Sequence, residues 1–377
     1  MTIEKCKYYN DHQTACCLMI DDLVPVAVSK DGKIGPGNDW GYLKDSKDSQ
    51  FNFLEEKLFS KYPEIRGTIF LPLAVHKHMK GNKDYQVFAT DFDDDFIRFL
   101  NKISSRFEFA FHGIRHTWKD DKTGSTVFEF ADPTNEDIAA AITEVKEFEQ
   151  KTGITFHGGK FPGYRYNRVA QNLLMDLKAE WWALDADMIN CPGAKNSILA
   201  DATSGIKYIP TNVSGDIFMD NPSQSAIRKL AKRIIRNKYY QKPGEYLLYL
   251  YKNGYPIIIQ EHYQNQGTSA KRQKPNLYDD ILSLDKIYGL LSSLDIWHSN
   301  CTEIAGYHDS YINTEIKSNS DEEFSVTYSG ESAIPGLTIR TDAENLLRKE
   351  NQTIIKGNRK NSNWIFNNIR PGTYIRK

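Results

Sequence analysis

Residues 109–118 read FAFHGIRHTW, which places two histidines, His112 and His116, four residues apart directly after an alternating apolar run. The run FEFAF (107–111) has the pattern of a β-strand, and Gly113 lets the backbone bend sharply behind it. Two imidazoles in this position are either incidental polar residues at a strand end or two ligands of one metal ion. Chance HxxxH pairs are common, so the rest of the chain must decide between these interpretations.

Apolar runs typical of buried strands alternate with helix-like stretches over about 300 residues of the chain. Strands are predicted at 14–20, 67–73, 107–111, 181–187 and 256–262, and helices at 51–62, 93–105, 133–153, 169–180, 225–240 and 280–294. The helix at 133–153 is the clearest, with Asn135 as its expected N-cap and Gly153 at its end. The alternation predicts an α/β fold in which helices surround a parallel sheet, open or closed into a barrel.

The last part of the chain has a different pattern. Short β-prone segments such as QTIIKG (352–357) and NWIFNNI (363–369) are separated by turn residues. We therefore expect two domains, an α/β domain at 1–310 and a small all-β domain at 311–377.

Composition excludes several classes of protein. The 377 residues include 48 basic and 49 acidic ones, which gives no electrostatic case for binding nucleic acid or an anionic membrane. The five cysteines are irregularly spaced without a CxxC motif, so we expect neither a disulfide framework nor a thiolate zinc site. No apolar segment resembles a signal peptide or a membrane span, which predicts a cytoplasmic protein if Met1 is the natural start. The sequence does not indicate an oligomeric state.

Acidic and imidazole side chains recur at the ends of the predicted strands, where parallel-sheet folds collect their chemistry. Each of these side chains alone could cap a loop or be a solvated charge. A chance arrangement would not place acidic and imidazole residues at four strand ends of one chain. Imidazole with carboxylate suits Zn²⁺, and Co²⁺, Ni²⁺ or Mn²⁺ less selectively. The residues are Asp21 and Asp22, His112 and His116, Asp185 and Asp187, and His262.

With these motifs the sequence resembles the polysaccharide deacetylases, the family that shares the chitooligosaccharide deacetylase homology domain. IDDLVP (20–25) matches the first motif of the family and HGIRH (112–116) the second, while KFP (160–162) matches its Arg-x-Pro motif loosely. WWALDAD and IIIQEH match the fourth and last motifs. The resemblance covers about residues 12–310. It implies an irregular (β/α) barrel that removes acetyl groups from amino sugars or sugar esters.

The resemblance also implies roles for the residues that match the motifs. Asp22, His112 and His116 would bind the metal ion, Asp21 would act as the general base, and His262 would protonate the leaving group.

The other matched positions imply further roles. Lys160, or Arg165 nearby, would take the place of an arginine that orients the base, although lysine lacks the bidentate grip of arginine. Asp187 or Asp185 would tune His262. The corner formed by Pro162, Gly163 and Tyr164 would contact the substrate, with a backbone N–H as an oxyanion donor.

A Gly-rich insertion at 29–48 follows the first motif. It is either a wall of the substrate cleft with Trp40 as a stacking platform, or a surface loop. The basic run at 228–238 could face an anionic sugar nucleotide or lipid phosphate, or be a solvated helix face.

These observations predict a metal-dependent deacetylase of an N- or O-acetylated sugar, with zinc as the expected metal. A cytoplasmic location favours a precursor in surface-polysaccharide or glycolipid biosynthesis, nucleotide-linked or lipid-linked. Two alternatives remain: a hydrolase of the same fold that acts on a non-sugar amide, and a non-catalytic carbohydrate-binding scaffold.

Overall fold

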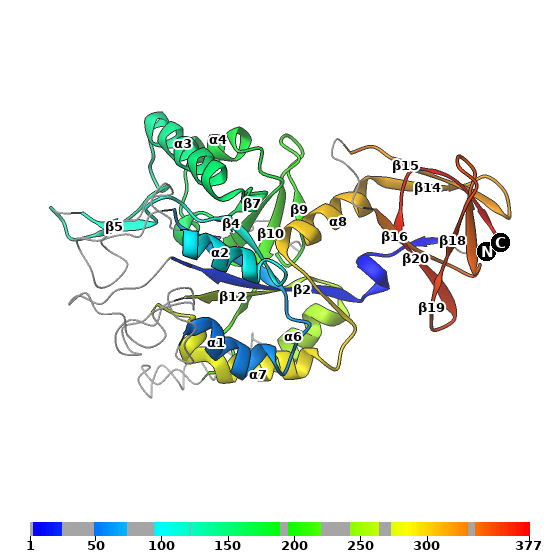
Figure 1. Cartoon of the computed structure of the whole chain (residues 1–377), viewed down its shortest axis with the longest axis horizontal. Coiled ribbons are helices and arrows are strands. Elements are labelled where there is room, and N and C mark those ends of the chain that lie inside the picture. Colours follow the sequence, from blue (N-terminus) through cyan, green and yellow to red (C-terminus); the bar gives the residue numbers. More distant parts are fainter. Residues whose placement is uncertain are drawn as a thin grey trace.

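The computed structural model describes residues 3–24, 49–73, 94–120, 122–188, 195–219, 242–263, 273–330 and 336–377. Its centre is a ten-stranded sheet in which the described strand pairs are parallel, apart from the antiparallel pair of β9 (Leu199–Ala200) and β10 (Lys207–Thr211) (Figure 1). This sheet consists of β2 (Thr14–Asp21), β3 (Gly67–Leu71), β4 (Phe107–Phe111), β7 (Gly158–Gly159), β8 (Trp181–Asp185), β9 (Leu199–Ala200), β10 (Lys207–Thr211), β11 (Val213–Ser214), β12 (Ile257–His262) and β13 (Ile296–His298). The predicted α/β fold with a parallel-strand sheet is confirmed.

The strands pair in the order β11-β12-β2-β3-β4-β7-β8-β10-β9, with β13 also paired to β2. This path is open, so the closed barrel that the resemblance implied is not confirmed. Only Asn212 separates β10, which pairs with β8, from β11, which pairs with β12. The chain therefore passes at Asn212 from one region of the sheet to the other, and the N–H of Asn212 donates to the carbonyl of Ile258 in β12 at 3.3 Å.

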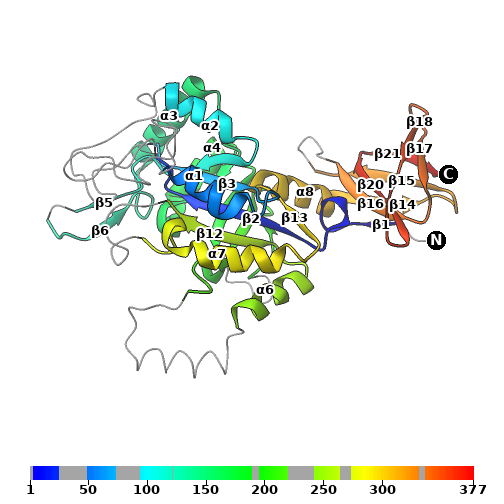
Figure 2. The same cartoon turned by 60° about the horizontal axis from the view of Figure 1, so that its bottom comes forward.

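Helices lie around the strands, with α3 and α4 on one side and α6 and α7 on the other (Figures 1 and 2). The helices are α1 (Gln50–Leu54, continued by a π-helical turn at Glu55–Phe59), α2 (Asp94–Ile103), α3 (Asn135–Thr152), α4 (Arg168–Asp176), α6 (Pro243–Lys252), α7 (Leu277–Leu291) and α8 (Cys301–Asn313). Among the described helices, none is long and apolar enough to cross a membrane.

Strand β2 explains how the core is divided. All eight of its residues are buried, as expected for a strand covered on both faces. Cys16, Leu18 and Ile20 belong to the larger hydrophobic cluster with the surrounding helices, whereas Cys17 and Met19 belong to a smaller cluster on the other face. Because side chains alternate along a strand, Asp21 lies on the face of the smaller cluster.

The C-terminal part forms two antiparallel sheets, which confirms its predicted all-β character. The N-terminal strand β1 joins one of these sheets by pairing with β16, so both ends of the chain lie at the same end of the molecule (Figure 2). One sheet has the order β1 (Glu4–Lys5), β16 (Leu337–Thr341), β20 (Asn363–Ile369) and β19 (Asn358–Lys360); the other has β14 (Thr314–Ser318), β15 (Glu323–Tyr328), β21 (Gly372–Arg376), β17 (Asn345–Arg348) and β18 (Thr353–Lys356). A separate hairpin joins β5 (Thr117–Lys119) to β6 (Thr126–Phe128).

The helix predictions need correction. The N-cap of α3 is Thr134 and not Asn135, because Thr134 and Asp137 form a reciprocal capping box. Helices α6 and α8 were not predicted. The predicted helix at 225–240, the basic run at 228–238 and the insertion at 29–48 lie outside the described residues.

Candidate metal centre and catalytic site

The candidate site lies where parallel strands end. His262, the last residue of β12, is paired in register with Asp21, the last residue of β2. His112 directly follows β4, which runs parallel to β3 and is therefore two strands from β2 in the same sheet. The carboxyl ends of these strands thus bring together side chains that are up to 241 positions apart in the sequence.

Asp22, His112 and His116 form a compact group of three buried side chains that could hold a metal ion. One potential ligand atom from each lies within 4.8 Å of those from the other two. Asp22 Oδ1 is 3.5 Å from His112 Nε2 and 3.3 Å from His116 Nε2. Two imidazole nitrogens and one carboxylate oxygen are a ligand set that suits zinc and similar divalent metals.

The state of these atoms fits a metal ion. Both oxygens of Asp22 are buried and have no hydrogen-bond partner among the described residues, and burial raises the pKa of Asp22 to about 7. Burial lowers the pKa of His116 to about 4 and that of His112 well below its usual value, so both rings are neutral near pH 7. The Nδ1 of His112 lies 2.9 Å from the carbonyl oxygen of Lys160. Donation of that bond leaves a lone pair on Nε2, the atom that faces Asp22.

The backbone at the two sides of this group is unusual. Asp22 has a φ of 70° and His116 a φ of 61°, in the left-handed region that most residues avoid. Such conformations cost about 1–3 kcal/mol each and occur preferentially at functional sites. Here both residues belong to the metal-ligand group.

Glu129 holds the turn that carries His116. Its Oε2 accepts hydrogen bonds from the backbone N–H groups of Ile114, Arg115 and His116 at 2.9, 3.0 and 3.0 Å. Gly113 begins this turn with a φ of 84°, and a Cβ there would lie 2.6 Å from the same oxygen. Position 113 therefore requires glycine for both conformation and space.

Asp21 is held next to the metal-ligand group by a buried lysine. Lys160 Nζ lies 2.5 Å from Asp21 Oδ2, and the ammonium is also 4.6 Å from the ring centre of Phe70 and 5.1 Å from that of Tyr164. Burial by itself raises the pKa of Asp21, but the charge and the hydrogen bond of Lys160 lower it. The pKa of Asp21 is therefore below its usual value, and the side chain is a carboxylate at neutral pH.

His262 and Gln260 complete the arrangement around Asp21. His262 Nε2 is 3.4 Å from Asp21 Oδ2, while its Nδ1 lies 2.8 Å from the carbonyl oxygen of Pro275, which fixes the ring. Gln260 Nε2 donates to Asp21 Oδ2 at 3.2 Å, and Gln260 Oε1 accepts from the hydroxyl of Tyr164 at 2.7 Å. Asp21 Oδ2 is thus the common partner of these side chains.

The structure separates the alternatives for the orienting cation. Lys160 contacts Asp21, whereas Arg165 is exposed and forms no ion pair with another described residue. The geometry therefore does not support a role for Arg165.

The expected tuning of His262 by Asp187 or Asp185 is also not supported. Asp187 is exposed and pairs with Lys195, and Asp185 accepts the backbone N–H of Asp187 at 2.9 Å. The Nδ1 of His262 instead faces the Pro275 carbonyl, because the segment after β12 lies against it. Trp40 lies outside the described residues.

The corner at Pro162–Tyr164 is a single 3₁₀ turn. Proline has no N–H, and the N–H of Tyr164 already donates to the carbonyl of Phe161 at 2.9 Å. Within this turn, Gly163 is the remaining backbone donor that could face an oxyanion. Gly163 packs closely against Phe128: a Cβ at this position would lie 2.3 Å from that ring.

Sequence reasoning missed two residues of the site. Gln260 could have been found, because it lies two positions before His262 on the same strand and so shares its face. Glu129 had no comparable signal, since it follows the β5–β6 hairpin and reaches the His116 turn only through the tertiary fold.

No family model and no curated protein matches the chain. Among solved structures, it is similar to a family 4 acetyl xylan esterase from Clostridium thermocellum in complex with a cobalt ion, at 13% identity, with 77% of this chain and 90% of that chain covered and a TM-score of 0.37. It is similar to a CE4 family pseudoenzyme from Bacillus anthracis at 14% identity, with 78% of this chain and 65% of that chain covered and a TM-score of 0.35. It is also similar to a 4-alpha-glucanotransferase from Thermococcus litoralis at 12% identity, with 78% and 40% covered and a TM-score of 0.43.

Further similar structures are described as deacetylases, the kind of protein that the sequence motifs resemble. All these likenesses are distant, and the assignment of function rests on the residues of the site itself.

Proposed function

We propose that this chain is a metal-dependent hydrolase that removes an acetyl group from a carbohydrate. The observation that supports it best is the position of Asp21 next to both the metal-ligand group and His262. Asp21 Oδ2 lies 3.8 Å from His112 Nε2 and 3.4 Å from His262 Nε2. A base, an acid and a metal site in one buried cluster are what hydrolysis of an amide or ester needs.

Asp22, His112 and His116 would hold the metal ion, for which zinc fits best and cobalt, nickel or manganese are alternatives. A divalent metal supplies Lewis-acid chemistry there, because it polarises an acyl carbonyl and makes water more acidic.

Asp21 would accept the proton of the attacking water. Its Oδ2 is already bound to Lys160 and Gln260, whereas its Oδ1 is buried without a hydrogen-bond partner among the described residues. Oδ1 is therefore the oxygen that we assign as the proton acceptor. The lowered pKa of Asp21 keeps it ionised, and Lys160 fixes its orientation.

His262 would donate the proton that the leaving group needs. The Pro275 carbonyl fixes its Nδ1, so Nε2 is the atom that faces Asp21 and the reacting bond. Water adds to the acyl carbon, the bond from that carbon to nitrogen or oxygen breaks, and the leaving atom takes the proton from Nε2. The products are acetate and a free amine or alcohol.

A carbohydrate substrate follows from the resemblance of the motifs to polysaccharide deacetylases. Cleavage of N- or O-acetyl groups, a nucleotide- or lipid-linked precursor in surface-polysaccharide or glycolipid biosynthesis, and a cytoplasmic location stay predictions.

Acetate release by the zinc-loaded and cobalt-loaded protein tests the proposal. The substrates are acetylated chitooligosaccharides, acetylated xylan and acetanilide as a non-sugar amide. We expect release from a carbohydrate and a loss of about 10²–10⁴-fold in Asp21→Asn, with the bound metal retained. Release from acetanilide alone would instead identify a hydrolase of non-sugar amides. Metal and oligosaccharide binding without any acetate release would identify a non-catalytic scaffold.

A further inference from the structure

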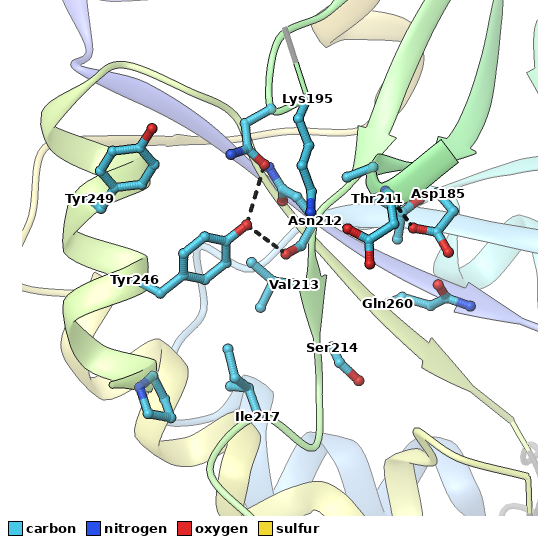
Figure 3. Close-up of a pocket in the computed structure, with 14 residues that line it drawn as sticks. Asp185, Lys195, Thr211, Asn212, Val213, Ser214, Ile217, Tyr246, Tyr249 and Gln260 are labelled. Carbon is cyan, nitrogen blue, oxygen red and sulfur yellow. Dashed lines mark hydrogen bonds and ion pairs between the residues drawn. The ribbon is translucent and has the colours of Figure 1, made fainter. Parts of the chain in front are cut away.

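A cavity of about 760 Å³ lies beside Gln260, the residue that donates to Asp21 (Figure 3). The ends of β8 and β10, strand β11 and helix α6 border it. This volume is in the range of small-molecule sites, roughly 300–1,000 Å³. Because Gln260 borders the cavity and contacts the catalytic carboxylate, a ligand in the cavity would adjoin the reacting group.

One wall of the cavity is aromatic. Tyr246 and Tyr249 project from α6, with ring centres 6.4 Å apart and ring planes only 17° from parallel. The hydroxyl of Tyr246 lies 3.2 Å from the carbonyl oxygen of Asn212 and 3.3 Å from Oδ1 of Asn196. Tyrosine faces next to amide groups suit a sugar ring, which has apolar faces and a polar edge.

The other wall carries negative charge. Among the described lining residues, the charged ones are Asp185, Asp187 and Lys195, and Lys195 pairs with Asp187. In the described part of the chain, no cationic side chain pairs with Asp185, which is half-buried and bound only to the N–H of Asp187. Burial and the negative charge of Asp187 raise the pKa of Tyr246 to about 12. The electrostatic effect of Asp187 therefore extends to the aromatic wall.

We propose that the cavity binds a sugar unit with a free ammonium group, next to the acetylated unit, and that Asp185 pairs with this ammonium. A carboxylate without a cationic partner and the faces of two tyrosines both attract an ammonium group. The same walls repel a phosphate or a uronic acid. This inference rests on the proposed function and defines its substrate as a partly deacetylated amino-sugar oligosaccharide.

Calorimetric binding to zinc-loaded Asp21→Asn protein tests the cavity without turnover. The two probes are fully acetylated chitobiose and chitobiose with a single acetyl group. We expect the singly acetylated probe to bind about tenfold more tightly at pH 6.5, because it adds one charge-assisted hydrogen bond. The preference should disappear above about pH 9, where the amine of the sugar is neutral.

The variant Asp185→Asn, combined with Asp21→Asn, should abolish the preference. The amide oxygen can still accept the N–H of Asp187, so the local turn is kept. Asp176→Asn is the matched control: it removes the same charge from an exposed residue at the end of α4 and should leave the preference intact.

Each outcome has a distinct meaning. Equal affinity for the two probes, a preference that survives Asp185→Asn, or no binding of either probe would overturn the inference. Acetate release by the wild type without the preference would leave the proposed function standing and reject the cavity's role. A preference that depends on Asp185, with no acetate release from any substrate, would support the amino-sugar site and reject the hydrolase.

Discussion

The Nζ of Lys160 lies 2.5 Å from Oδ2 of Asp21, and both side chains are buried. A buried ion pair stabilises a fold only modestly, since both charges lose their water, but removal of one partner leaves the other uncompensated. The pair therefore makes the Asp21 carboxylate, our proposed base, tolerable in the interior and keeps it ionised.

The first prediction concerns this pair. Lys160→Met should lower the free energy of unfolding by about 3–5 kcal/mol, because the Asp21 carboxylate is left without its cation. Asp21→Asn added to Lys160→Met should restore part of that loss, whereas Asp21→Asn alone should destabilise the protein. Urea denaturation of the four proteins in a double-mutant cycle measures this coupling. If Asp21→Asn changed the free energy of unfolding equally in the wild type and in Lys160→Met, the two side chains would not interact and the ion pair would be contradicted.

The second prediction concerns Glu129, which binds no metal itself. Glu129→Ala removes the acceptor of three N–H groups in the His116 turn and should weaken zinc binding about 10–100-fold, as is typical for loss of a group that orients a ligand. Competition with a zinc chelator measures the dissociation constant.

Glu129→Gln is the matched variant, since its amide oxygen can still accept these bonds. It should stay within a few-fold of the wild type in zinc affinity. Equal zinc affinity in the wild type and Glu129→Ala would show that the turn keeps its shape without this side chain.

The third prediction separates the stability of the fold from the function of Asp22. Burial raises the pKa of Asp22 from 3.8 to about 7. Ionisation of Asp22 therefore lowers the free energy of unfolding progressively as pH rises between these values, and the loss remains at higher pH. In the presence of EDTA at pH 8, Asp22→Asn should therefore unfold at a higher temperature than the wild type.

Zinc should reverse this order. At a free concentration of 100 times the dissociation constant, zinc adds about 2.7 kcal/mol to the stability of the wild type and should add little to Asp22→Asn. His157→Gln is the control, since that exposed histidine pairs with Glu180 and is not part of the metal-ligand group, so it should leave the zinc effect unchanged. A variant that is less stable than the wild type in EDTA would show that the Asp22 carboxylate has a stabilising partner.

The strand ends could be predicted because the buried strands β2 and β12 carry apolar runs, and acidic or imidazole side chains appear in them only near their carboxyl ends. Strands β2, β4 and β12 match their predicted ranges to within one residue. Asp21, Asp22, His112 and His262 therefore followed from pattern alone, although their mutual distances did not.

The remaining features depend on contacts that no local pattern encodes. Strand β1 pairs with β16 across more than 300 residues, and Glu129 meets the His116 turn through the packing of a hairpin. Asp185 and Asp187 were expected beside His262 because WWALDAD resembles the fourth motif of the family, but they line the cavity beside Gln260. The sequence indicates that a side chain is at a strand end, but its direction depends on the turn that follows.

The last prediction uses Gln260 to move the pH profile of the reaction. Gln260→Glu puts a second carboxylate at the position from which an amide nitrogen now donates to Asp21 Oδ2 at 3.2 Å. A like charge at this distance raises the pKa of Asp21. Since Asp21 must be ionised to act as the base, the acid limb of kcat/KM should move to higher pH by about one unit or more, with a smaller loss of activity at pH 8 than at pH 6. Gln260→Met is the matched control, because it removes the same hydrogen bonds without adding charge. It should shift the acid limb of kcat/KM less, while lowering kcat/KM at every pH. Acetate release from an acetylated chitooligosaccharide, measured from pH 5 to pH 9, distinguishes the two variants. An acid limb that stays in place in Gln260→Glu would mean that Asp21 is not the group whose ionisation controls the reaction.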